Sequence, residues 1–297
     1  MLDGILVVNK PPGETSNTTL QRVKRLYAAN KAGHTGSLDP LATGVLPICF
    51  GEATKFSQYL LDSDKEYLVT AELGIRTNTS DVEGEVVERR PVPAFTAADI
   101  EAVLEKFRGP LLQVPSMFSA LKHQGQPLYK FARQGIEIER EARPIVVYNN
   151  ALIELALPRF QLQIRCSKGT YVRTLIDDIG EVLGCGAHVV FLHRTKAGPY
   201  HETQAVDLPQ LEQWVDDHQF DAMDDLLLPM ASAVSNWPEV QLTENTYYYL
   251  QQGQPVLVPK APVEGWVRLM QGDDNFVGVG EILEDGRVAP RRLVVNQ

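Results

Sequence analysis

The sequence has few cysteines and no long apolar run. Its 297 residues include three cysteines, Cys49, Cys166 and Cys185, which are odd in number and widely separated. This usage argues against a disulfide framework and favours reduced thiols in a cytoplasm. No apolar run approaches the length of a membrane span, and the first residues carry no basic region. We therefore expect neither a membrane anchor nor a signal peptide.

A zinc site is the other role that scattered cysteines and histidines suggest. Cys185, His188 and His193 lie close together in the sequence. Their spacing fits no closed zinc pattern, and there is no second cysteine pair. We expect these side chains to have structural roles and the protein to bind no metal.

Basic residues are absent from one long stretch. Residues 201–259 contain ten acids and no lysine or arginine, so they account for the whole net charge of -10. Residues 159–200 hold six basic side chains against three acids, and the first 60 residues hold six against four. Phosphate binding depends on the local face, so an overall acidic protein can still bind RNA. The acidic stretch either orients such docking or only keeps a surface solvated, and both can hold.

The length suggests about two domains, and Trp237-Pro238 marks a candidate boundary after the acidic stretch. Local patterns predict that Ser16 caps a first helix, that Thr96 and Asp99 cap a second, and that Gly184 ends a third. The predicted helices after the first cover residues 97–107, 170–183 and 243–252. The predicted strands cover residues 5–9, 66–75, 85–87, 266–270, 276–282 and 293–295, with a hairpin turn at 157–160.

A glycine-rich loop early in the chain holds a lone carboxylate. Its glycines Gly33, Gly36 and Gly44 mark backbone that turns tightly or lets another group approach closely. Asp39 is the only acid in the loop, and the proline after it favours an extended conformation. A carboxylate on a stiff loop is a candidate catalytic group, but it could equally cap the element that follows.

This loop resembles the catalytic loop of the TruB-type tRNA pseudouridine synthases, whose aspartate lies in a Gly-x-Leu-Asp core, here Gly36-Ser37-Leu38-Asp39. Other segments resemble the family in the expected order along nearly the whole chain: GILVVNKP (4–11), KEY (65–67), PSMFSALK (115–122), SKGTYVR (167–173) and GRVAPRR (286–292). One position departs, because many members have aspartate where this chain has Asn9. We expect that position to support the loop.

The resemblance implies an α+β fold. A catalytic domain over residues 1–236 would be built around a largely antiparallel mixed sheet with a central cleft, and a small β-rich, PUA-like RNA-binding domain would follow over residues 237–297. In the family an inserted segment, here about residues 115–143, clamps the RNA stem-loop. Its interleaved basic and aromatic side chains suit single-stranded RNA, although three glutamates dilute the charge.

The resemblance also implies an isomerase that converts uridine to pseudouridine at position 55 of tRNA, in the TψC loop. The bond between ribose C1′ and uracil N1 breaks, and the base turns and reattaches through C5. No redox change occurs, so we expect no cofactor. The site needs one carboxylate, a dry pocket and a way to extract the base from its stack. Asp39 would be that carboxylate; attack on the sugar, attack on the base and removal of the C2′ proton all remain open.

Three residues would support Asp39. In the family the arginine that corresponds to Arg173 pairs with the catalytic aspartate, and such a partner keeps a carboxylate ionised in a dry pocket. Without the resemblance, Arg173 would be interpreted as an arginine at a helix amino terminus that contacts phosphate or solvent. Lys10 and Pro11 would support the loop; their alternative role is to end an edge strand.

Four residues would contact the RNA. The resemblance implies that Tyr67 stacks on the target uracil and that Tyr171 and Leu192 line the same pocket. It also implies that His34 enters the tRNA loop and occupies the space of the flipped base. By pattern alone, Tyr67 and Leu192 are ordinary strand residues and His34 is an ordinary loop histidine.

Three other functions compete with this hypothesis. A non-catalytic RNA-binding or tRNA-folding protein would not need Asp39. A guide-RNA-dependent modifier of rRNA would need partner proteins. A glycosidase would need a second positioned acid, which the motifs do not supply. We expect a cytoplasmic, monomeric enzyme that binds the T-arm stem-loop of tRNA, with no obligate protein partner and no membrane association.

Overall fold

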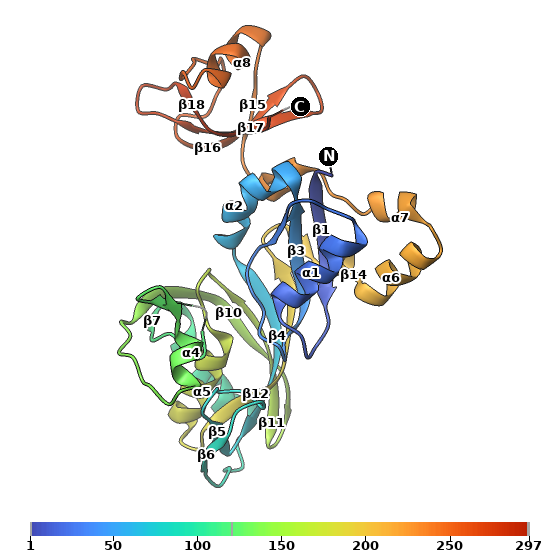
Figure 1. Cartoon of the computed structure of the whole chain (residues 1–297). Coiled ribbons are helices and arrows are strands. Elements are labelled where there is room, and N and C mark those ends of the chain that lie inside the picture. Colours follow the sequence, from blue (N-terminus) through green and yellow to red (C-terminus); the bar gives the residue numbers. More distant parts are fainter. Residues whose placement is uncertain (1, 120, 296–297) are drawn as a thin grey trace. The chain divides into compact units, whose positions relative to one another are not determined.

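The computed structural model describes residues 2–119 and 121–295, and the chain divides into two compact units (Figure 1). Unit 1 comprises residues 1–39, 45–61 and 197–297, and unit 2 comprises residues 40–44 and 62–196. Ala120, which falls in the predicted RNA-clamping insertion, lies outside the described residues. Among the described residues, no helix combines the length and the apolarity that crossing a bilayer requires.

The first part of unit 1 packs helices against a short sheet. β1 (Gly4–Lys10) is almost completely buried because its Ile, Leu and Val side chains are apolar on both faces. It pairs in parallel with β14 (Val206–Asp207), while β2 (Ala32–His34) pairs antiparallel with β3 (Thr43–Phe50). The helices here are α1 (Ser16–Leu26), η1 (Gly51–Phe56), α2 (Ser57–Leu61), η3 (Glu202–Gln204), α6 (Leu208–Asp216), α7 (Phe220–Asp224) and η4 (Met230–Val234), and one further short strand is β13 (Tyr200–His201).

The last part of unit 1 is a small four-stranded sheet, which confirms the predicted β-rich tail. Its elements are β15 (Glu239–Gln241), α8 (Glu244–Gln251), β16 (Gly265–Gln271), β17 (Asn275–Ile282) and β18 (Val288–Leu293). The prediction of a last strand at residues 293–295 is wrong. A turn closed by the Leu283 N–H and the Arg287 carbonyl starts β18 earlier. Pro290 disguises the strand in the sequence, but an edge strand with a register shift tolerates proline.

Unit 2 is built on a sheet in the order β12 (Ala187–Ala197), β4 (Lys65–Leu73), β11 (Arg159–Cys166), β10 (Arg143–Ala156) and β7 (Gly109–Gln113). β10 and β11 form the predicted hairpin. The other elements of the unit are β5 (Ile75–Thr77), β6 (Val86–Arg89), α3 (Ala97–Leu104), η2 (Glu105–Phe107), β8 (Lys122–His123), β9 (Gln126–Pro127), α4 (Leu128–Ala132) and α5 (Val172–Leu183).

The strand pairings confirm a mixed, largely antiparallel sheet. The β4–β11, β11–β10 and β10–β7 pairs are antiparallel. The β1–β14 pair and the pairing of His193 and Arg194 with Thr43 and Gly44 are parallel. Gly44 has φ +103°, and a Cβ there would lie 2.3 Å from the Arg194 carbonyl oxygen. Only glycine therefore fits this crossing of strands.

The observed helix ends match the ends predicted from the sequence where the capping hydrogen bonds join residues close in the chain. Thr96 and Asp99 form the predicted capping box of α3, and Gly184 ends α5 with φ +85°. The prediction for Ser16 is wrong. Thr15 is the N-cap of α1 and accepts a bond from the Thr18 N–H, while Ser16 is the first helical residue. Its hydroxyl is therefore available to a distant part of the chain.

Candidate active site

The loop that carries Asp39 is fixed at the residue before it. Leu38 is 7% exposed, its N–H donates to Ser16 Oγ at 2.8 Å, and Ser16 Oγ donates to the Leu38 carbonyl at 3.2 Å. Gly36 has φ +82°, which lets the chain turn after β2. By contrast, Gly33 has no positive φ, so the tight turn predicted there is not found, and a Cβ at this position would meet no protein atom within 4 Å. α1 thus holds the backbone next to the candidate carboxylate.

Lys10 and Pro11 form the turn that leads into α1. Lys10 is completely buried, and its ammonium donates to the carbonyls of Pro11 at 2.7 Å and Glu14 at 2.6 Å. These bonds close the connection between β1 and the helix that carries Ser16. His34 is the last residue of β2 and pairs with Ile48 of β3, so it lies at the entrance to the Asp39 loop.

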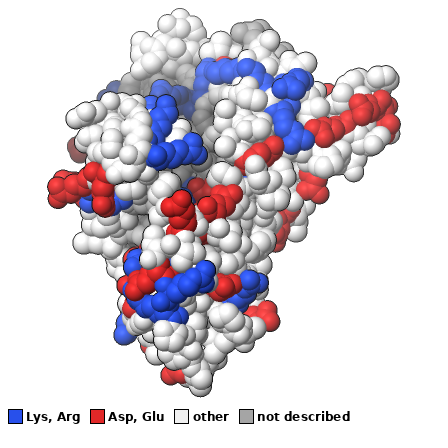
Figure 2. All heavy atoms as spheres, turned by 60° about the horizontal axis from the view of Figure 1, so that its bottom comes forward, with Lys and Arg blue, Asp and Glu red and all other residues white. Residues whose placement is uncertain are grey.

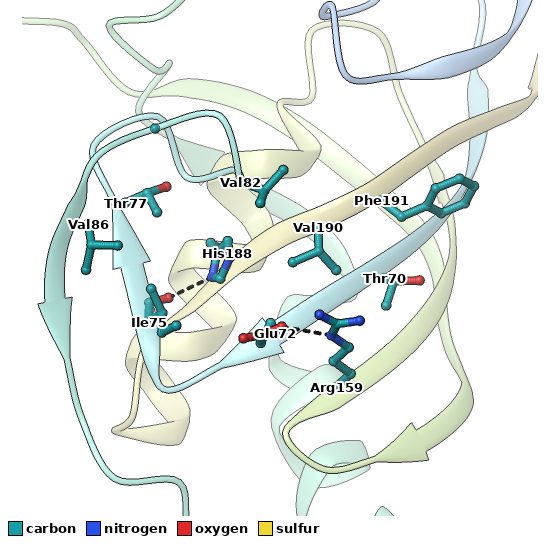
Figure 3. Close-up of a pocket in the computed structure, with 11 residues that line it drawn as sticks. Thr70, Glu72, Ile75, Thr77, Val82, Val86, Arg159, His188, Val190 and Phe191 are labelled. Carbon is teal, nitrogen blue, oxygen red and sulfur yellow. Dashed lines mark hydrogen bonds and ion pairs between the residues drawn. The ribbon is translucent and has the colours of Figure 1, made fainter. Parts of the chain in front are cut away.

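In unit 2, Tyr67 and Leu192 point to the same side of the sheet. Tyr67 lies opposite the buried Ile164 of β11, and the alternation along β4 places it with the buried residues of that strand. On β12, the rings of Phe191 and His193 are parallel within 4°, with centroids 6.3 Å apart, so they share one face. Phe191 lines a groove together with Thr70 (Figure 3). Thr70 and Tyr67 are three residues apart on β4, so their side chains project to opposite faces. Leu192, 4% exposed, therefore faces the Tyr67 side.

Tyr171 and Arg173 lie at the amino terminus of α5. Tyr171 is the N-cap residue, and the buried Gln113 side chain holds its backbone by accepting from its N–H at 2.8 Å and donating to its carbonyl at 3.1 Å. Arg173 is 5% exposed. Its Nη1 donates to the Thr79 carbonyl at 2.8 Å, and its Nη2 donates to the Phe118 carbonyl at 3.0 Å. The guanidinium is thus held from two separate segments of unit 2.

Asp81 is a partner of Arg173 that the sequence did not reveal. Its Oδ2 lies 3.2 Å from Arg173 Nη1, and the two side chains are 4% and 6% exposed. Asp81 Oδ1 accepts from Thr79 Oγ1 at 2.6 Å and from the Glu83 N–H at 3.0 Å. Asp81 begins a turn, since the Gly84 N–H donates to the Asp81 carbonyl. Nothing local links it to an arginine 92 residues away.

The groove of Figure 3 is not the predicted pocket. It has a volume of about 600 Å³, and none of the eight predicted site residues lines it. Its walls include His188, whose Nδ1 donates to the Ile75 carbonyl at 3.1 Å, and Arg159, whose Nε donates to Glu72 at 2.8 Å. His188 thus has a structural bond, as expected, and the groove opens on the face of β4 opposite Tyr67.

Comparison with known proteins identifies the fold and then the family. The chain shares the fold of the pseudouridine synthases: a chain of a Cbf5–Nop10–Gar1 complex superposes with a TM-score of 0.76 at 26% identity, over 99% of this chain and 84% of that one. Residues 24–172 match the amino-terminal domain of the TruB family of pseudouridylate synthases, and residues 173–235 and 238–294 match two carboxy-terminal domains of TruB. The chain belongs to the TruB family.

Two curated relatives cover almost the whole chain. The tRNA pseudouridine synthase B of Coxiella burnetii (strain Dugway 5J108-111) is 55% identical over 293 residues, which are 99% of this chain and 95% of the relative. The tRNA pseudouridine synthase B of Yersinia pestis (strain Pestoides F) is 57% identical over 302 aligned positions, which cover 99% and 93%.

Acidic side chains gather on one segment of unit 1. Figure 2 shows them on the α6–α7 segment, at the right of the view. This segment carries Glu212, Asp216, Asp217, Asp221, Asp224 and Asp225 and has no lysine or arginine. A face of this kind repels phosphate, so RNA binding has to use other parts of the surface.

Proposed function

We propose that this protein is a tRNA pseudouridine synthase that isomerises uridine to pseudouridine at position 55, in the T-loop of tRNA. The observation that carries the proposal is the 55–57% identity, over 99% of the chain, with enzymes named tRNA pseudouridine synthase B. The Asp39 loop also supports the proposal. Its backbone is held in place next to Asp39, and a catalytic carboxylate has to be positioned accurately against one atom of its substrate.

The roles of the site residues follow from this function. Asp39 carries the chemistry. Arg173 keeps the Asp39 carboxylate ionised, and Asp81 fixes the orientation of the Arg173 guanidinium. Tyr67 stacks on the uracil and Leu192 packs beside it. The buried ion pair of Arg173 with Asp81 supports this division, because it locks the guanidinium before RNA arrives.

The remaining predicted residues recognise RNA or support the loop. Tyr171 lines the base pocket, and His34 takes the place of the extracted base. Lys10 and Pro11 hold the turn on which the Asp39 loop depends, as the ammonium bonds of Lys10 suggest. We also propose that residues 115–143 clamp the stem-loop. In that segment the Arg133 guanidinium lies 5.4 Å from the centroid of the Tyr129 ring, a pairing that leaves a charged, aromatic surface for bases.

We propose a catalytic domain over residues 1–236 and a PUA-like RNA-binding domain over residues 237–297. The enzyme acts as a cytoplasmic monomer, without a metal or cofactor and without an obligate protein partner, on the T-arm stem-loop of tRNA. The isomerisation moves one bond within the nucleotide and needs no electron carrier.

Tritium release tests the function directly. Unmodified tRNA labelled with tritium at C5 of uridine loses the label to water only where C5 forms the new bond to C1′. Release of one tritium per tRNA, with the product mapped to position 55, is the expected result. The matched control is Asp39→Asn, which keeps the side-chain volume. A protein that binds tRNA tightly and releases no tritium would establish a binding function instead.

A further inference from the structure

Two buried cations lie on the face of the unit 2 sheet that carries Tyr67. Lys65 is 7% exposed and Arg194 is 1% exposed. Lys65 precedes Tyr67 by two residues on β4, so both side chains project to the same face. Arg194 follows Leu192 by two residues on β12, the strand that neighbours β4, and shares the face of Leu192. Neither cation has a role in the function proposed above.

The surroundings of Lys65 make its charge responsive to pH. Burial, and after it the charge of Arg194, lower the pKa of Lys65 to about 8, while the carboxylates of Asp62 and Asp64 act in the opposite direction. The Lys65 ammonium donates to the Ser63 carbonyl, which holds it in place. Cys166 lies opposite Lys65 on β11, and burial raises the pKa of its thiol to about 12, so it stays neutral. The local potential therefore depends on the protonation of Lys65.

We propose that Lys65 is a positioning residue of the isomerisation, whose ammonium group stabilises the negative charge that develops on the uracil stacked against Tyr67. The inference rests on the function proposed above. It assigns to Lys65 an electrostatic role without contact with the base. The charge of Arg194, which already acts on Lys65, supplies another part of the same potential.

The same charge develops on each chemical route that remains open. If the C1′–N1 bond breaks with its electron pair left on N1, after attack on C1′ or loss of the C2′ proton, the uracil becomes an anion delocalised over its carbonyl oxygens. If a carboxylate adds to C6, the electron pair of the C5–C6 double bond moves towards O4. Each route gives an electron pair to the base, so a fixed positive charge beside Tyr67 lowers the barrier of each.

The expected size follows from Coulomb's law. Two unit charges about 8 Å apart, at an effective dielectric constant of about 20, interact with an energy that corresponds to roughly a 30-fold change in rate. Because deprotonation removes the charge, the rate falls as the pH rises through the pKa of Lys65.

Single-turnover rates between pH 6.5 and 9.5, with saturating enzyme and the tritiated T-arm stem-loop, test the proposal. The wild-type rate should fall above about pH 8. Lys65→Met should be about 30-fold slower at pH 7, bind RNA within threefold of wild type and lack this alkaline decrease. Lys65→Arg should keep most of the rate and also lack the decrease, since arginine does not titrate. Lys106→Met removes an exposed lysine of the same unit and should match wild type.

The outcomes separate the inference from the function on which it rests. If wild-type protein releases no tritium, the proposed function fails. If wild type is active and Lys65→Met stays within threefold of it at pH 7, or keeps the same alkaline decrease, the role of Lys65 is wrong. A decrease that comes from the uracil N3–H or from Tyr67 would persist in every variant. If the Met and Arg variants lose the same share of the single-turnover rate and keep the wild-type pH profile, the role of Lys65 is purely structural.

One measurement does not depend on the variants folding. The Cε carbon signal of Lys65 in wild-type protein, titrated by NMR and assigned by its loss in Lys65→Arg, should change with a midpoint near pH 8. The midpoint should rise when the stem-loop binds, because the RNA brings negative charge. A midpoint above pH 10, or one that RNA leaves in place, would overturn the proposal.

Discussion

Asp81→Asn tests the buried ion pair of unit 2, because it removes the charge and keeps the volume. The Asp81 and Arg173 side chains are 4% and 6% exposed, and removal of one member of a buried ion pair costs about 3–5 kcal/mol. The amide oxygen of asparagine can still accept from Thr79 Oγ1 and the Glu83 N–H. We therefore expect a loss near the lower limit, about 3 kcal/mol.

The assay must report on unit 2. All three tryptophans, Trp214, Trp237 and Trp266, belong to unit 1, so their fluorescence does not serve. Hydrogen exchange measured on peptides that cover β5 and α5 reports on the stability of unit 2. A loss of about 3 kcal/mol lowers the protection of amides that exchange through opening of the unit by roughly 150-fold.

The control for this variant is an ion pair nearer the surface. Asp64→Asn breaks the bond with Arg165, where the side chains are 37% and 53% exposed, and such pairs contribute about 0–1 kcal/mol. The reasoning is refuted if Asp81→Asn lowers protection no more than threefold beyond this control. If Asp81 orients Arg173, the variant should also lower the single-turnover rate while tRNA binding persists.

Four further results are expected. Asp39→Asn should bind tRNA normally and lose at least about a thousandfold in turnover; residual turnover within tenfold of wild type would contradict its assignment. The purified enzyme should keep full activity in EDTA, and activity that chelation abolishes and zinc or magnesium restores would disprove this, provided that the tRNA stays folded. On a stem-loop whose target base is already unstacked, the defect of His34→Ala should shrink and that of Arg173→Ala should persist, because only the first acts through a flipping cost of a few kcal/mol; equal rescue would show that one role is wrong. Reversal of the exposed charges Lys260 and Arg292 should weaken tRNA binding and reduce its salt dependence by about one unit of slope per lost phosphate contact, with unchanged turnover at saturating RNA; unchanged affinity would argue against RNA binding by the last domain.

The sequence predicted those features whose hydrogen bonds are local. The Thr96 capping box and the Gly184 helix end depend on residues three or four positions away, and both are confirmed. Ser16 was assigned the wrong role because a serine hydroxyl can either cap its own helix or bond to a distant segment. In this structure it bonds to Leu38, 22 residues away. Asp81 was missed for the same reason, since its partner Arg173 is 92 residues away.

The parts of the site that came from family motifs remain predictions about roles. The sequence could suggest that Tyr67 and Leu192 share a pocket only through the resemblance, because a strand tyrosine and a strand leucine are usually core residues. Strand alternation in unit 2 gives them a common face, which no single-sequence pattern specifies. Lys65 was named only as part of a motif, and the role proposed for it rests on its burial and on the nearby charge of Arg194.

The acidic α6–α7 segment has a consequence for how the enzyme shares the cell with other RNA. Ribosomal RNA presents far more phosphate than any single tRNA, and a uniformly basic enzyme would be bound to it non-specifically. A net charge of -10 makes the free energy of random RNA contact unfavourable at long range. The enzyme therefore stays on RNA only where short-range contacts and an extractable base outweigh this repulsion. Such a protein associates more slowly with its tRNA substrate, but a larger fraction of it stays unbound by other RNA and it releases its product faster.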